Sequence, residues 1–191
     1  PDVIVQANDE AEVVTAMQRA AREGLKVGVR SGGHSWAGNH VRDGGMLLDV
    51  SRLREVHVDA RSMRATAGPG CAGHELAETL RPHGLFFPAG HCKGVCIGGY
   101  LLQGGFGWHG RKLGLACMSV LGIDYVDAAG QRHHASPTEN EDMYWAARGA
   151  GPGFFGVVTR FHVRVYERPR FLGMAMATHP LRALAPVFRW A

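Results

Sequence analysis

The stretch that organises the chain is Arg30-Ser31-Gly32-Gly33-His34-Ser35. It follows the short apolar run 25–29, which is typical of a strand, and it precedes a segment rich in glycine. Two adjacent glycines permit positive φ and let the backbone turn its amide groups toward a single point. This pattern predicts a loop that cradles a phosphate, with His34 just beyond it. The alternative is a tight β-turn followed by a surface histidine.

The composition fits one globular domain, or one domain and the start of another. Of the 191 residues, 46% are hydrophobic and 20% are charged, which is enough to bury a core. The 27 glycines are about twice the usual share of roughly 7%. They cluster at 28–45, 90–114 and 149–156, where we expect the backbone to approach a ligand or another backbone.

Charge and hydropathy disfavour nucleic acid and membrane as partners. The net charge of +4 is modest, and the lysines and arginines are scattered rather than striped. The longest uncharged stretch, 94–108, is too short and too rich in glycine to span a bilayer. No signal peptide is visible, but the chain opens at Pro1 without a methionine, so the compartment is not predicted.

Hydrophobic periodicity predicts a strand-helix-strand-loop-strand unit in about the first 55 residues. The helix begins after Asp9, with Glu12 as its capping-box partner, and ends at Gly24. Strands are expected at 3–5, 25–29 and 46–50. Further along, the patterns predict a hairpin at 56–59 and 63–67, helices at 73–82 and 141–148, and strands at 120–127, 132–135 and 155–165.

The last residues predict the beginning of a second domain. Residues 171–178 have the pattern of a strand, and 180–191 that of an apolar helix. An apolar helix at this point needs a surface to pack against, so we expect the chain to stop just inside that domain.

Two motifs point to other kinds of site and are weak. Gly105, Gly107 and Gly110 form a G-x-G-x-x-G pattern, but the flanking glycines do not suit the strand and helix that a dinucleotide fingerprint needs. His91, Cys92 and Cys96 lack the second ligand pair of a structural zinc site, so no metal is predicted. The four cysteines are also too few for a disulfide framework. Three of them lie among small apolar residues and are predicted to be buried thiols: Cys71, Cys96 and Cys117.

Several motifs occur in a characteristic order and spacing between residue 1 and about residue 168. They are Arg-Ser-Gly-Gly-His-Ser at 30–35, Gly-His-Cys-x-x-Val at 90–95, Gly-Gly-x-x-x-x-Gly-Gly-Phe-Gly at 98–107, Arg-Lys-x-Gly-Leu at 111–115, Trp-Ala-Ala-Arg-Gly at 145–149 and Gly-x-x-Gly-x-Val at 153–158. Together they resemble the berberine-bridge-enzyme-like flavoprotein oxidases of the vanillyl-alcohol-oxidase group.

The resemblance implies an α+β fold, the PCMH-type FAD-binding fold. It would occupy residues 1–169, with α/β subdomains at about 1–55 and 56–169. Residues 170–191 would then begin a substrate-binding domain.

The resemblance also implies an FAD that is held covalently at two points. His34 matches the histidine bonded to the 8α-methyl carbon of the flavin, and Cys92 matches the cysteine bonded to C6. Oxidised flavin is electron-poor at both positions, so an imidazole nitrogen and a thiolate can add there as nucleophiles. The loop at 30–35 would wrap the pyrophosphate. The cofactor-binding residues implied in this way are Arg30, Ser31, Gly32, Gly33, His34, Ser35, Cys92, Val95, Gly98, Gly99, Tyr100, Gly156 and Val158.

Three positions depart from the family pattern or refine it. Tyr100 stands where a histidine is frequent, near the flavin pyrimidine ring, and Gln103 stands where glycine is common. Val95 lies at the position over the flavin face that oxygen approaches, where valine resembles the oxidases and isoleucine the dehydrogenases.

The resemblance thus implies an oxidase that acts on an alcohol, sugar or amine-type small molecule and uses O2, which is reduced to H2O2. The base that activates the substrate would lie outside this chain. Two alternatives stay open: a dehydrogenase of the same fold that uses another electron acceptor, and a flavin-binding module without catalytic activity.

Overall fold

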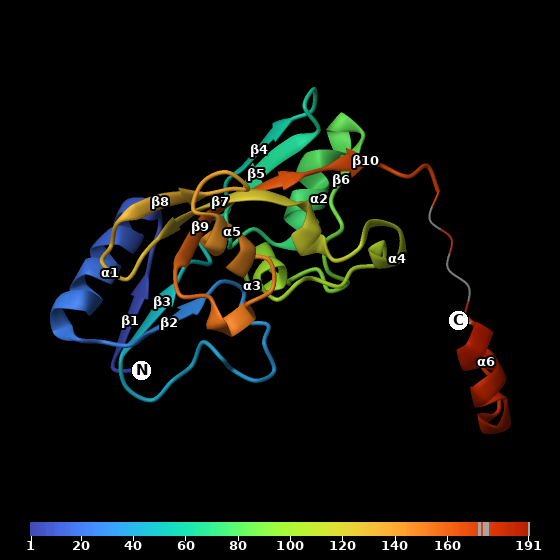
Figure 1. The fold of residues 1–191 in the computed structure, drawn as a ribbon, viewed down its shortest axis with the longest axis horizontal. Helices are drawn as coiled ribbons and strands as arrows, with labels where there is room; N and C mark the ends of the chain where they lie inside the picture. Colours follow the sequence, from blue (N-terminus) through green and yellow to red (C-terminus); the bar gives the residue numbers. More distant parts are fainter. Residues whose placement is uncertain (172, 174–175, 191) are drawn as a thin grey trace.

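The computed structural model describes residues 1–171, 173 and 176–190. Its N-terminal part is a three-stranded parallel sheet with the strand order β1-β3-β2 (Figure 1). The strands are β1 (Val3–Gln6), β2 (Val27–Arg30) and β3 (Met46–Asp49), and helix α1 (Glu10–Glu23) connects the first two. The predicted strand-helix-strand-loop-strand unit is therefore confirmed. Because β2 and β3 run in parallel, Arg30 lies directly beside Asp49 where both strands end.

Helix α1 begins and ends where the sequence predicts. The Asp9 carboxylate accepts the N–H of Glu12 at 2.9 Å, and Gly24 ends the helix in the left-handed conformation with φ 65°. The reciprocal half of the capping box differs from the prediction. The Glu12 carboxylate accepts the N–H of Asn8 at 2.8 Å, one residue before the cap.

The central part of the chain forms a five-stranded antiparallel sheet with the order β4-β5-β9-β7-β8. Its strands are β4 (Val56–Asp59), β5 (Arg64–Ala67), β7 (Val120–Val126), β8 (Arg132–Ala135) and β9 (Val157–Arg164). The predicted hairpin and the later strands are all present, with ends that shift by at most two residues. A two-stranded sheet that was not predicted pairs β6 (Leu85–Phe86) with β10 (Tyr166–Glu167).

Short helices complete the fold. They are α2 (Gly73–Leu80), α3 (Ile97–Leu102), α4 (Gly110–Leu113), α5 (Glu141–Ala146) and α6 (Leu184–Trp190). Helix α3 was not predicted, because its segment shows no clear period. The strand expected at 171–178 lies partly outside the described residues, and the described positions of that stretch are not in a strand. No residue of α6 is buried.

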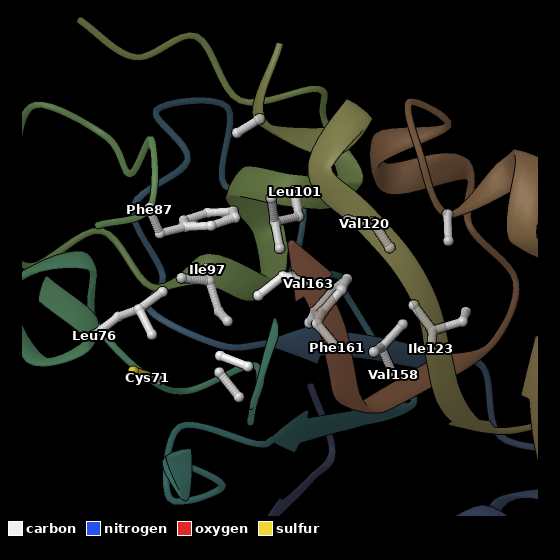
Figure 2. Close-up of a cluster of buried hydrophobic side chains, with 14 of the residues drawn as sticks. Cys71, Leu76, Phe87, Ile97, Leu101, Val120, Ile123, Val158, Phe161 and Val163 are labelled. Atoms are coloured by element: carbon white, nitrogen blue, oxygen red, sulfur yellow. The ribbon is translucent and has the colours of Figure 1, made fainter. Parts of the chain in front are cut away.

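The larger of two hydrophobic cores lies against the antiparallel sheet (Figure 2). Phe161 and Val163 on β9 and Ile123 on β7 point toward Ile97 and Leu101 of α3. These five side chains are almost completely excluded from solvent. Burial of this kind contributes about 1.5–3 kcal/mol for each large apolar side chain. The packing fixes α3, and with it the segment that leads into this helix.

The second core joins the parallel sheet to the five-stranded antiparallel sheet. It contains the buried face of α1 and residues of the parallel sheet, together with Val126 of β7 and Val157 of β9. Among the described residues, no helix is both long enough and apolar enough to cross a bilayer. The division into subdomains at about residue 55 stays a prediction.

Candidate functional site

A cleft of about 750 Å³ lies where the loop after β2, the segment 92–96, α3 and the segment 151–158 meet. All the residues that the resemblance assigns to the cofactor line this cleft: Arg30, Ser31, Gly32, Gly33, His34, Ser35, Cys92, Val95, Gly98, Gly99, Tyr100, Gly156 and Val158. They come from segments far apart in the sequence. Members of all three glycine clusters contribute to the lining, as expected for places where backbone approaches a ligand.

The Gly32-Gly33 turn is built so that only glycine fits. Gly33 has φ 66°, a left-handed conformation that is costly for residues with a side chain. A Cβ on Gly33 would lie 2.8 Å from Nε of Arg30, and a Cβ on Gly32 would lie 2.9 Å from Sγ of Cys96. The turn therefore brings bare backbone to the cleft wall, which is the arrangement a phosphate cradle requires.

An ion pair fixes the start of this loop. The Arg30 guanidinium donates to the carboxylate of Asp49, which also accepts the N–H of Ser51 at 2.9 Å. Burial opposes ionisation of Asp49, but the hydrogen bonds from Ser51 and the charge of Arg30 outweigh it and lower its pKa. Arg30 is thus held against the protein at the edge of the cleft.

Ser31 connects the loop to α3. Its hydroxyl accepts the N–H of Gly99 at 3.3 Å. A Cβ on Gly98 would come within 3.0 Å of the Ser31 hydroxyl and 2.9 Å of the Pro69 carbonyl. The two glycines of α3 therefore allow the helix to pack directly against the loop.

His34 and the segment with Cys92 approach each other across the cleft. A Cβ built on Gly94 would lie 3.4 Å from Nε2 of His34, so this imidazole lies beside the 92–95 turn. The turn is closed by a hydrogen bond of 3.2 Å from the N–H of Val95 to the carbonyl of Cys92. One planar ligand can therefore meet both His34 and Cys92.

Cys92 differs from the other cysteines in its exposure. All four lie in the described part of the chain, and Cys92 alone is exposed. Burial raises the pKa of the Cys71 thiol to about 12 and also raises the pKa values of Cys96 and Cys117. The prediction that these three are buried thiols is confirmed. Cys92, in contrast, is accessible from the cleft that it lines.

Tyr100 lines the cleft, but its hydroxyl is used within the protein. The hydroxyl donates to the Pro88 carbonyl at 2.9 Å, and burial raises the pKa of Tyr100 to about 12. Carbon atoms of its ring lie 3.3 Å from the Cβ position of Gly90 and 2.7 Å from that of Gly105. Tyr100 therefore connects α3 to the segment that leads to Cys92.

The structure adds lining residues that sequence reasoning did not assign to the site. After the Gly-Gly turn the chain folds back over β2, where the His40 carbonyl lies 2.6 Å from the Cβ position of Gly28. The most prominent additions are Trp36, Asn39, His40, Arg42 and Phe154. All of them lie within the glycine clusters, which are the signal that the sequence offers for them.

These features fit FAD. The volume lies in the range of about 300–1,000 Å³ that is typical of ligand pockets. The glycine turn offers a cradle that a side chain would fill, and the lining contains a histidine and an exposed cysteine as nucleophiles. His34 and Cys92 would hold the flavin end of the cofactor, and the loop at 30–35 would hold its phosphates.

Comparisons with known proteins agree with this fit. The model of the FAD binding domain family matches residues 1–136. The FAD-linked oxidoreductase ptmO of Penicillium ochrochloron is 39% identical over 178 residues, which cover 90% of this chain and 40% of the relative.

Solved structures show the same relationship. BBE-like 1 of Physcomitrella patens has a TM-score of 0.81 at 32% identity, covering 86% of this chain and 36% of that one. Glucooligosaccharide oxidase of Acremonium strictum, described with a 6-S-cysteinyl, 8α-N1-histidyl FAD, has a TM-score of 0.81 at 30% identity, covering 87% of this chain and 35% of that one. The chain thus spans about two fifths of the length of its relatives or less. It belongs to the family of PCMH-type FAD-binding domains that the berberine-bridge-enzyme-like oxidases share.

Proposed function

We propose that this chain is the FAD-binding part of an oxidase in which His34 and Cys92 hold the flavin covalently. The observation that carries the proposal is the convergence of His34 and the exposed Cys92 on one cleft. The related glucooligosaccharide oxidase, whose FAD is linked to a histidine and a cysteine, supports it. The reaction would oxidise an alcohol, sugar or amine-type small molecule, with O2 as the final electron acceptor.

When bound, FAD would supply the redox chemistry, accepting hydride from the substrate and passing the electrons to oxygen. The residues of this chain bind and orient the cofactor. His34 and Cys92 would fix the plane of the ring from two loops, so that the ring could neither rotate nor leave. We assign no residue of this chain the role of the base that activates the substrate.

Val95 supports the choice of oxygen as the acceptor. It is half-buried in the cleft wall, three residues after Cys92, and its Cγ1 lies 3.7 Å from the Cβ position of Gly90. The backbone around it is fixed, because the Val95 carbonyl accepts the N–H of Gly73 at 2.9 Å. A larger side chain here has to extend into the cleft. Valine therefore leaves more room beside the proposed ring position than isoleucine would.

The test compares reoxidation by O2 in the photoreduced wild type and in Val95→Ile, which needs no knowledge of the substrate. An added methylene obstructs the path by which O2 reaches the ring, because few voids in a close-packed site are larger than a water molecule, so the rate of reoxidation should fall. Stopped-flow absorbance should show this decrease in Val95→Ile. Val29→Ile is the matched control, since Val29 is an exposed residue of the same cleft, and its rate should equal that of wild type.

Two results would contradict the proposal. If wild type reoxidises as slowly as Val95→Ile, the protein is a dehydrogenase that passes electrons to another carrier. If the protein binds FAD but neither consumes O2 nor reduces dyes with any alcohol, sugar or amine, it is a flavin-binding module without catalytic activity.

A further inference from the structure

Two histidines and one aspartate meet on the antiparallel sheet, away from the flavin cleft. Asp124 lies on β7, His134 on β8 and His162 on β9, which are three adjacent strands. None of these residues lines the cleft. The proposed function assigns them no role.

The polar atoms of the three side chains converge. Nδ1 of His134 lies 2.7 Å from one carboxylate oxygen of Asp124, and Nε2 of His162 lies 3.0 Å from the other. One potential ligand atom from each residue lies within 4.8 Å of the other two. The imidazole planes are nearly perpendicular at 79°, with their centroids 5.2 Å apart. Tetrahedral ligands at about 2.0–2.2 Å from one metal ion lie about 3.3–3.6 Å from one another. Small side-chain shifts, which open the two hydrogen-bonded pairs and bring the imidazoles closer together, would therefore admit an ion.

The strand register builds the cluster. Asp124 pairs directly with His134 across β7 and β8, and Gly122 pairs with His162 across β7 and β9. A Cβ on Gly122 would lie 3.2 Å from Cε1 and 3.3 Å from Nε2 of His134. Glycine at this position therefore leaves the space that the His134 imidazole occupies beside His162.

The surroundings of the cluster decide whether a cation can enter. Asp124 supplies a carboxylate whose two oxygens face His134 and His162. Arg160 lies 3.7 Å from the same carboxylate and would repel a metal ion, although it also lies 3.8 Å from the carboxylate of Glu55. The three side chains are 25–39% exposed, so water can complete a coordination shell.

We propose that Asp124, His134 and His162 form a binding site for one divalent transition metal ion of the Zn²⁺ type. Two imidazoles and a carboxylate with an open position are a ligand set typical of zinc in proteins. A metal ion here joins β7, β8 and β9, and it stabilises the fold because the unfolded chain does not hold the three ligands together.

The adjacent residue on β8 offers a matched control. Nε2 of His133 lies 2.9 Å from the Asp127 carboxylate, so the same kind of histidine–aspartate pair is present without a third ligand. If pairing of a histidine with a carboxylate were enough to bind zinc, His133 and His134 would contribute equally to the affinity for Zn²⁺. If three ligands are required, only the cluster with His162 binds.

The experiment is a calorimetric titration of ZnCl₂ into the flavin-loaded protein without a histidine tag. Wild type and His133→Gln should each bind one Zn²⁺ with the same affinity. Loss of a residue that only supports a metal ligand lowers the metal affinity about 10- to 100-fold. His134→Gln and His162→Gln each remove a ligand itself, so their affinity for Zn²⁺ should fall at least about tenfold. Zn²⁺ should also raise the urea midpoint of wild type and of His133→Gln, but not that of the other two variants.

Absence of saturable binding in wild type would overturn the proposal, as would equal losses in His133→Gln and His134→Gln. Zinc held elsewhere on the protein would leave His134→Gln unaffected and would overturn it as well. Since His134 and His162 lie on different strands, each variant gives a separate test. Far-UV circular dichroism equal to wild type establishes that a variant is folded.

Discussion

Gly33 illustrates how a single residue controls the cleft. Its φ of 66° is unfavourable for any residue with a Cβ, and the Cβ position lies 2.8 Å from the Arg30 side chain. Arg30 cannot move away freely, because Asp49 holds its guanidinium. A side chain at this position therefore disturbs both the backbone and the ion pair at the entrance to the loop.

The variant Gly33→Ala should lower the flavin content of the purified protein, measured as the ratio of flavin to protein absorbance. Gly24→Ala is its control, because Gly24 has nearly the same φ of 65° but no atom within 4 Å of its Cβ position. Both variants should lose stability, by about 1–2 kcal/mol from the left-handed backbone. Only Gly33→Ala should lose flavin, and equal flavin contents would show that the loop does not cradle the cofactor.

Residues that act within short motifs could be predicted from the sequence, and residues joined by strand register could not. The glycine turn with His34 and the segment with Cys92 each carry their signal in a few neighbouring positions. Asp124, in contrast, lies 10 residues from His134 and 38 from His162. Their meeting depends on how β7 pairs with β8 and with β9, which the hydrophobic periodicity of each strand alone does not encode.

At the scale of elements, α3 is the part of the site that sequence reasoning missed. It contains Gly98 and Gly99, and glycine in a helix costs about 0.8–1.0 kcal/mol relative to alanine. Tertiary packing compensates, because Ile97 and Leu101 are buried in the main core. The glycines also let α3 contact Ser31. The same two residues thus weaken the helical signal in the sequence and allow the helix to pack against the cleft.

Removal of the Tyr100 hydroxyl tests whether α3 positions the Cys92 segment. Tyr100→Phe loses the hydrogen bond to Pro88, and Tyr144→Phe loses an equivalent bond of 2.9 Å to Val120, away from the cleft. Each should lower the free energy of unfolding by about 1 kcal/mol, measured by urea denaturation. Peptide mapping should find less Cys92-linked flavin in Tyr100→Phe than in wild type, and an unchanged amount in Tyr144→Phe.

If the two tyrosine variants contain equal amounts of Cys92-linked flavin, the hydrogen bond made by Tyr100 of α3 does not position the Cys92 segment. The hydroxyl of Tyr100 would then contribute to stability alone.

At the scale of the whole molecule, the parallel sheet and the five-stranded antiparallel sheet stabilise one another. Val126 and Val157 of the antiparallel sheet are buried in the core formed by α1 and the parallel sheet. Glu10 at the start of α1 adds polar contacts, accepting the Thr159 hydroxyl at 2.7 Å and pairing with Arg132 at 3.0 Å. Neither sheet can lose its structure without exposing apolar surface of the other.

We therefore expect residues 1–169 to unfold in a single cooperative transition. Near-UV circular dichroism, which reports the packing of the buried Tyr125 and Tyr144, and far-UV circular dichroism should give the same urea midpoint. Val126→Ala should lower both midpoints together. Two separate transitions, or a shift of one midpoint alone, would mean that the parts before and after about residue 55 unfold independently.

The central claim is that His34 and Cys92 each form a covalent bond to one FAD, and mass measurement under denaturing conditions tests it most directly. Wild type should keep one FAD mass after acid denaturation, and His34→Ala and Cys92→Ala should each keep it through the remaining bond. The double variant should release it completely. Loss of FAD from denatured wild type, or its retention by the double variant, would contradict the account.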